Sequence, residues 1–110
     1  MINKDIVYLK HIRDAILDIE KYLGDNTYSS LEENSMLLDA IVRKLEIIGE
    51  ATNNLSSNFK NSHPEIVYRD IIDMRNFLIH EYFGISTKIV WDTCKTDLPK
   101  LKKSIITILS

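Results

Sequence analysis

The chain has 110 residues, enough to bury one hydrophobic core but not two. Its formal net charge of −2 argues against a protein that coats nucleic acid electrostatically, and leaves room only for a local basic patch. The single cysteine, Cys94, excludes an internal disulfide and fits a reducing compartment. No apolar run approaches the roughly 20 residues of a membrane span, and the first residues, MINKDIVYLK, lack a signal-peptide core. We therefore expect one soluble, cytoplasmic domain over residues 1–110.

The first half of the chain predicts two main helices. Apolar residues recur at spacings of three and four up to Leu23, which indicates an amphipathic helix that stops at Gly24-Asp25-Asn26. Ser29 or Ser30 is then expected to start a new element, with an acidic residue three positions later completing a capping box. A second main helix is expected from about residue 34 to residue 55.

The second half of the chain predicts two more main helices. A polar connection, SSNFKNSHPE, follows the second helix, and Pro64 within it suits the first turn of a short helix. A third main helix is expected from about Tyr68 to Phe83, ended by Gly84. Ser86 is then a plausible N-cap for a last helix that runs to about residue 109.

Pro99 lies inside the last predicted helix, where we expect a kink or a break because proline lacks an N–H donor and its ring clashes with the preceding turn. No segment shows the strict alternation of a half-buried strand. The predicted fold is an all-α antiparallel bundle of four main helices plus a short connecting helix.

The segment RNFLIHEYFG, residues 75–84, places a permanent charge and a titratable ring among apolar residues. On a helical wheel Arg75 lies near the middle of the apolar face of the third helix. Burying an unpaired guanidinium is costly, so Arg75 must have a partner or face a cleft. Glu46 and Glu50 are candidate partners, and a structural ion pair is as good an interpretation here as a functional cleft.

His80 lies about 140° round the same helix and about 7.5 Å further along it, with Asn76 as its neighbour four residues before. One rigid helix does not press Arg75 and His80 together. Distortion of the helix, reach of the arginine, or two copies that meet across a symmetric interface would do so. A single histidine or tyrosine on a helix, such as His80 or Tyr82, is more often structural than catalytic.

Other patterns are weaker. His11, His63 and His80 lack metal-ligand spacing, so no metal is expected, and no G-x-G-x-x-G or P-loop predicts a nucleotide cofactor. Cys94 is interpreted as a small buried side chain. The lysines at 100, 102 and 103 form a solvated cluster near the C-terminus, or at most a modest phosphate-facing patch.

The segment RNFLIH, residues 75–80, resembles the R-x4-H signature of the HEPN superfamily, and HEY extends it to the R-x4-H-x-Y form of the HepT-like branch. Three stretches resemble that branch in the expected order: VRKLEIIGEAT (42–52), HPEIVYRDIIDMRNFLIHEYFGI (63–85) and VWDTCKTDLPKLK (90–102). The resemblance covers most of the chain. It departs at Tyr68, where the branch has tryptophan.

This resemblance implies a homodimer that acts as the ribonuclease toxin of a two-gene toxin–antitoxin system, with a minimal nucleotidyltransferase as its partner. It implies that Arg75 and His80 are the catalytic pair and that Asn76 is a polar helper. It also implies that the partner transfers AMP onto Tyr82 and so silences the toxin. No cofactor or metal is implied.

The residue types fit metal-independent RNA cleavage. A neutral His80 could take the proton of the 2′-hydroxyl, and Arg75 offers a planar fork suited to the phosphate oxygens. Because the 2′-hydroxyl is the nucleophile, DNA should be spared and the products should end in a 2′,3′-cyclic phosphate.

Two other readings remain. The first is a non-catalytic subunit that presents substrate or nucleotide to a nucleotidyltransferase, which the acidic net charge favours slightly. The second is a helical dimerisation module with a buried Arg–Glu pair, in which Arg75→Ala should cost about 3–5 kcal/mol. Only the ribonuclease reading predicts that His80→Ala abolishes RNA cleavage while the protein stays folded.

Overall fold

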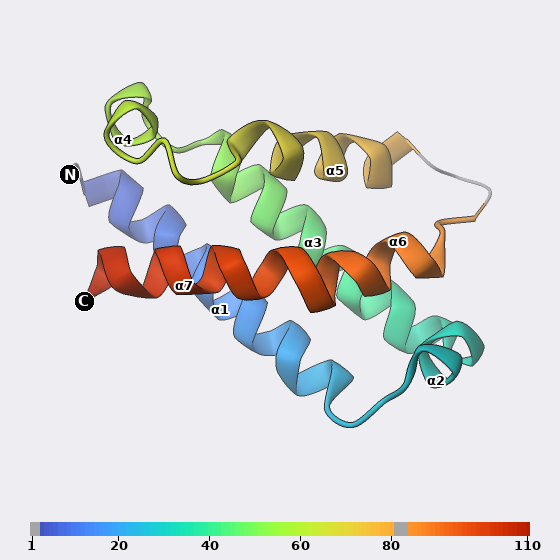
Figure 1. Cartoon of the computed structure of the whole chain (residues 1–110). Helices are drawn as coiled ribbons and strands as arrows, with labels where there is room; N and C mark the ends of the chain where they lie inside the picture. The colour runs from blue at the N-terminus through green and yellow to red at the C-terminus, as the bar shows by residue number, and fades with distance from the viewer. Residues whose placement is uncertain (1–2, 81–83) are drawn as a thin grey trace.

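A computed structural model describes residues 3–80 and 84–110, and the described part contains helices and no strands (Figure 1). Its elements are α1 (Asn3–Leu23), α2 (Tyr28–Glu33), α3 (Ser35–Asn53), α4 (Ser57–Ser62), α5 (Tyr68–His80), α6 (Thr87–Asp92), the π-helical turn η1 (Thr93–Asp97) and α7 (Leu98–Leu109). The long helices α1, α3 and α5 and the continuous α6–η1–α7 run in alternating directions (Figure 1). The predicted all-α bundle of four main helices is confirmed.

The predicted helix ends are mostly confirmed. Helix α1 stops before Gly24, whose φ of 46° is in the left-handed region that glycine tolerates. Asn34 caps α3, because its side chain accepts a hydrogen bond from the backbone N–H of Leu37. The predicted start at Ser29 or Ser30 is wrong: Thr27 is the cap of α2, and its hydroxyl accepts from the N–H of Ser30 at 3.1 Å.

The short helix after α3 also differs from the prediction. Helix α4 ends at Ser62, so Pro64 follows it and does not lie in its first turn. The cap is Ser56, whose hydroxyl accepts from the N–H of Phe59. The buried carboxylate of Asp5 in turn accepts from the N–H and the hydroxyl of Ser56, at 2.8 and 2.7 Å. Asp5 thereby fixes the start of α4 on α1, a contact that no local pattern signals.

The kink or break predicted at Pro99 takes the form of an irregularity in the helix and not of a break. Ser86 caps α6 as expected, and the chain stays helical from there to Leu109. The irregularity takes the form of the π turn η1, in which the N–H of Leu98 donates to the carbonyl of Thr93, five residues back. A wider turn just before Pro99 accommodates a residue that has no N–H and whose ring crowds the preceding turn.

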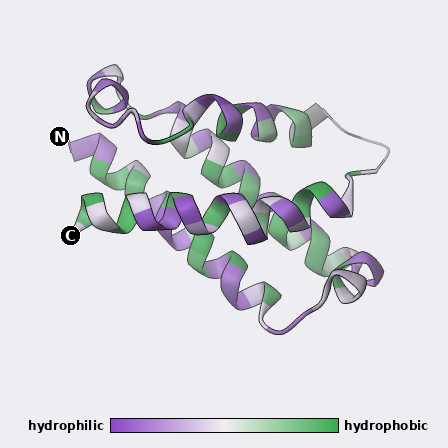
Figure 2. Ribbon diagram, viewed as in Figure 1, coloured by the Kyte–Doolittle hydropathy of each residue, from purple (hydrophilic) through white to green (hydrophobic). Residues whose placement is uncertain are grey.

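The hydrophobic core lies where α1 packs on α3 and α7, with α5 on the other side of α3. Apolar residues line the inward faces of these helices (Figure 2). Cys94 is buried in this core, as predicted, and burial raises the pKa of its thiol to about 12. Of the helices described, none has the length and hydropathy of a membrane span.

Helix α5 carries the segment singled out in the sequence. It begins at Tyr68, as expected, where the Tyr68 hydroxyl donates to the backbone carbonyl of His63 at 2.6 Å. Burial, followed by the charge of Glu65, raises the pKa of Tyr68 to about 12. The helix is described up to His80, and its predicted continuation to Phe83 lies outside the described residues.

Candidate active site

Arg75 lies where α5 crosses α3, directly over Gly49. A Cβ atom placed on Gly49 would overlap the Cβ and Cγ atoms of Arg75. The absence of a side chain at Gly49 therefore lets the two helices approach closely enough for the Arg75 stem to pack on the α3 backbone. The sequence analysis did not single out this glycine. A glycine inside a helix, where it weakens helix propensity, is the signal that could have found it.

The Arg75 guanidinium has two polar partners. Its Nη2 forms an ion pair with Oε2 of Glu50 on α3, and its Nη1 donates to Oδ1 of Asn76 at 2.9 Å. Glu50 was one of the two predicted partners. The other, Glu46, pairs instead with Arg43 at 3.5 Å on the surface of α3.

The Arg75–Glu50 pair is not buried. The Arg75 side chain is 27% exposed and that of Glu50 is 50% exposed. The aliphatic stem is thus covered while the charged head reaches solvent, as is common for arginine. The prediction that Arg75 sits on an apolar face and needs a partner is confirmed, but the pair stands in an opening and not in the core.

That opening is a groove of about 400 Å³ over α3, between α1 and α5; we call it the Arg75 groove. Tyr8 and His11 of α1 form one side, with their rings edge-on and their centroids 6.4 Å apart. Arg43, Glu46, Glu50 and Arg75 supply two positive and two negative charges. Sequence analysis treated His11 as scattered, because it lies far from Arg75 along the chain.

The Arg75 groove has hydrogen-bond donors that could bind an anion, beside a carboxylate that already occupies some of them. Arg75 presents a planar set of donors, and Glu50 and Asn76 hold that plane in one orientation. An anion that approached the guanidinium would compete with the Glu50 carboxylate for its donors. The rings of Tyr8 and His11 give the opposite wall flat surfaces on which a base could stack.

The other predicted site residues are placed only in part. Asn76 is exposed beside Arg75 and contacts it. His80 is the last residue of α5, five positions after Arg75, and its backbone is helical. Tyr82 lies outside the described residues. The structure thus brings Arg75, Asn76 and Glu50 together. Among the side chains that the structure describes, those of residues 3–78 and 84–110, no three metal-ligating groups form a cluster.

Comparison with known proteins shows which family this chain resembles. The family profile described as "Ribonuclease HepT-like" matches residues 12–108. The "Probable ribonuclease HepT" of Thermococcus cleftensis is 41% identical over 95 residues, which cover 86% of each chain. A protein of Caldanaerobacter subterraneus subsp. tengcongensis, named provisionally as an RNase, is 39% identical over 103 residues, covering 93% of this chain and 91% of the relative.

A third relative is longer. A Methanocaldococcus jannaschii protein, whose name joins a gamma-glutamylcyclotransferase to a provisional RNase, is 39% identical over 107 residues. That match covers 96% of this chain but only 48% of the relative, so the chain spans about half of that protein's length. No solved structure gives a significant match. The family match, which extends over most of the chain, shows that it belongs to the HepT-like ribonuclease family of the HEPN superfamily.

Proposed function

We propose that this chain is a metal-independent endoribonuclease, the toxin of a two-gene toxin–antitoxin system that acts on RNA in the cytoplasm. One observation carries the proposal: the Arg75 guanidinium stands at an open groove, oriented by Glu50 and Asn76, in a member of a ribonuclease family. The names of the relatives, "Probable ribonuclease HepT" among them, support the same activity.

In this mechanism His80 removes the proton from a 2′-hydroxyl, and the oxygen attacks the adjacent phosphorus. The negative charge that develops on the phosphorane oxygens is stabilised by Arg75, whose donors match those oxygens. Asn76 keeps the guanidinium oriented. The bond from phosphorus to the 5′-oxygen breaks, this oxygen takes a proton from water, and His80 returns its proton to solvent, so that the upstream product ends in a 2′,3′-cyclic phosphate. No step requires a metal ion.

A homodimer would complete this site. Arg75 packs toward α3, and position 80 follows five residues later on the helix, so a single α5 does not place both residues on one phosphate. Phe77, an apolar residue of α5, is 39% exposed. Two copies of α5 that met through such apolar positions would line a shared groove with Arg75 and His80 from both chains.

The partner in this proposal is a minimal nucleotidyltransferase that transfers AMP from ATP onto the Tyr82 hydroxyl. Because Tyr82 follows His80 by two residues, the added phosphate would bring negative charge and bulk to the place where RNA must bind. Like-charge repulsion and steric obstruction would then both inhibit cleavage.

RNA cleavage in excess EDTA tests the proposal. We expect wild type to cut RNA, to spare a DNA strand of the same sequence, and to leave cyclic phosphate ends. His80→Ala and Arg75→Ala should each lower the cleavage rate by about 100-fold to 1,000-fold while circular dichroism shows an intact fold. Arg69→Ala is the matched control, because Arg69 lies on the same helix, is 91% exposed and is outside the groove.

A second candidate function is a non-catalytic subunit that binds substrate or nucleotide for a nucleotidyltransferase. It is favoured by the Glu50 carboxylate, which already neutralises Arg75, and by the net charge of −2. Wild type that is inert on every RNA tried, yet binds the nucleotidyltransferase, would support this candidate and remove the cleavage mechanism. Full activity in His80→Ala would remove the catalytic assignment of His80.

A further inference from the structure

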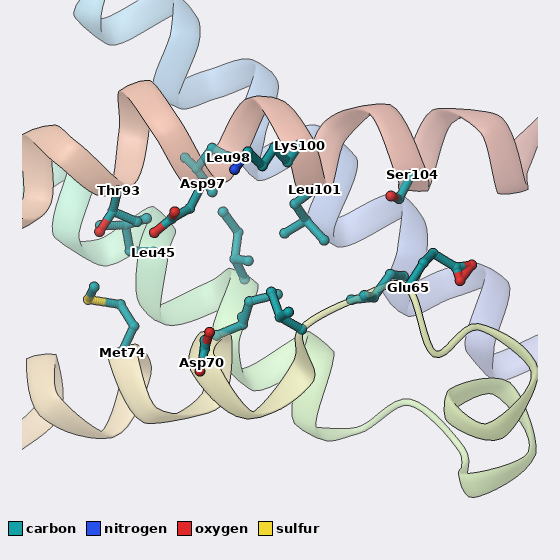
Figure 3. A pocket seen from close by; sticks show the side chains of 14 residues that line it. Leu45, Glu65, Asp70, Met74, Thr93, Asp97, Leu98, Lys100, Leu101 and Ser104 are labelled. Carbon is teal, nitrogen blue, oxygen red and sulfur yellow. The ribbon is translucent and has the colours of Figure 1, made fainter.

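A second groove lies on the other side of α5, between α5 and the helix formed by η1 and α7 (Figure 3). Its volume is about 340 Å³, and Leu45 and Ile48 of α3 form its floor. Met74 of α5 and Leu101 of α7 project into the gap from opposite walls (Figure 3). We call it the α5–α7 groove. It is an apolar slot large enough for one or two side chains of another molecule.

The rim of this groove is acidic. Glu65, Asp70 and Asp97 line it, against one cation, Lys100. Glu65 pairs with His63 at 3.1 Å, but no cation pairs with Asp70 or Asp97 among the described side chains of residues 3–78 and 84–110. The whole chain has 16 acidic and 14 basic residues, so outside this groove the formal charges balance. The four charged residues that line this apolar slot therefore carry a formal net charge of −2.

The π turn contributes to this arrangement. Thr93 and Asp97, the first and last residues of η1, both line the groove. A π turn inserts an extra residue into a helical turn and so changes the direction in which the following side chains point. Asp97 projects toward α5 as a result (Figure 3). Such turns occur often at functional sites, and this one buries Thr93 and Cys94 while Lys95, Thr96 and Asp97 are exposed.

We propose that the α5–α7 groove binds a basic amphipathic segment of a partner protein. An apolar side chain of that segment would lie between Met74 and Leu101, and flanking lysine or arginine side chains would pair with Asp70 and Asp97. Charge complementarity selects this occupant: carboxylates on both walls repel RNA phosphates. In a symmetric dimer that places the groove against itself, the same carboxylates would face one another.

This inference does not depend on ribonuclease activity, because the groove lies on the side of α5 turned toward α7 and Arg75 lies on the side turned toward α3. The helix-in-groove mode of recognition needs apolar anchors at spacings of three and four, with charged residues beside them. A peptide can therefore stand in for the partner.

The test uses a fluorescein-labelled helical peptide with leucines at spacings of three and four and lysines beside them, followed by fluorescence anisotropy. A second peptide keeps the leucines and replaces each lysine with glutamate. We expect the lysine peptide to bind at least about 10-fold more tightly to the full chain than the glutamate peptide does, and to weaken as salt is added.

Variants locate the binding. Asp70 and Asp97 are exposed, so the double change Asp70→Asn with Asp97→Asn should leave the fold intact and weaken binding of the lysine peptide about 5-fold to 10-fold. Val67→Lys, at a groove position that is 61% exposed, should weaken it further by repulsion. The control Asp39→Asn removes an exposed carboxylate outside the groove and should change the affinity less than about 2-fold.

Three outcomes would overturn the inference. Equal binding of the two peptides would make the groove an apolar cavity without charge selection. No binding of the lysine peptide up to about 1 mM would leave the groove without this ligand class. A change in self-association of Val67→Lys, measured by sedimentation velocity, would mean that a second copy of the chain covers the groove.

Discussion

The two sides of α5 meet the rest of the bundle in opposite ways. On the α3 side, the helices approach so closely that Gly49 has no room for a single methyl group beside Arg75. On the α7 side, a groove of about 340 Å³ separates α5 from η1 and α7. The same helix is therefore held tightly along one line and left uncovered along another.

This difference has a physical origin in the side chains. A glycine opposite a long stem allows backbone contact, and the ion pair between Arg75 and Glu50 then links the two helices at the rim. On the α7 side, Ser104 is too small and Asp70 and Asp97 too polar to fill the gap. The closed side of α5, where it contacts α3, can position a charged group for chemistry. The open side, where the α5–α7 groove lies, can accept a side chain from another protein.

The largest effect is expected from filling the closed side. Gly49→Val would force α3 and α5 apart, and we expect a loss of about 3 kcal/mol in the free energy of unfolding, measured by urea titration. Gly49→Ala should also destabilise the protein, although alanine gains up to about 1 kcal/mol over glycine in helix propensity.

Ser104→Val is the control for overpacking, since it adds one heavy atom, as Gly49→Ala does, at a position where the α5–α7 groove has room. It should change stability by less than about 0.5 kcal/mol. If Gly49→Ala proved more stable than wild type, α3 and α5 would not be in the close contact described above.

A smaller effect is expected from Arg75→Ala. Because the pair with Glu50 is partly exposed, its loss together with the packing of the stem should cost about 1 kcal/mol. The buried-pair reading requires about 3–5 kcal/mol. Urea titration of Arg75→Ala, with Arg69→Ala as the control, distinguishes the exposed-pair from the buried-pair interpretation. A loss of about 3–5 kcal/mol in the free energy of unfolding would show that the main role of Arg75 is structural.

The closed side was partly predictable from the sequence. Helical periodicity placed Arg75 on the apolar face of α5 and so required a partner for it, and Glu50 was one of two candidates. The choice between Glu46 and Glu50 was not predictable, because it depends on the angle at which α3 crosses α5. The close approach of the two helices depends on Gly49, which acts through a contact between residues far apart in the chain.

The open side was not predictable at all. Asp70 and Met74 lie on α5 and Asp97 lies on η1, far along the chain, and no spacing in the sequence indicates that they face one gap. Competition between alternative local structures explains the smaller differences between the predicted and the observed helices. Thr27 caps α2 in place of the later serines, and Pro99 produces a π turn and not a break, because a helix can widen by one residue at a lower cost than it can end.

The smallest expected effect is a loss of stability at alkaline pH, to which two groups contribute. Burial raises the pKa of Cys94 in η1 to about 12 from 9.0, and that of Tyr68 at the start of α5 to about 12 from 10.0. Both groups stay neutral in the folded protein while the unfolded chain releases its protons, so stability must fall as the pH rises from about 9 toward 12.

Between about pH 8 and pH 9.5 the fall should be less than about 1 kcal/mol, and most of it should come from Cys94, whose unfolded pKa is the lower of the two. Urea titrations at both pH values check this. Cys94→Ala should remove most of the pH dependence of the free energy of unfolding in that range. Tyr68→Phe should reduce that dependence only above about pH 10. An equal alkaline loss in wild type and Cys94→Ala would show that the thiol of Cys94 is not shielded from solvent in the folded protein.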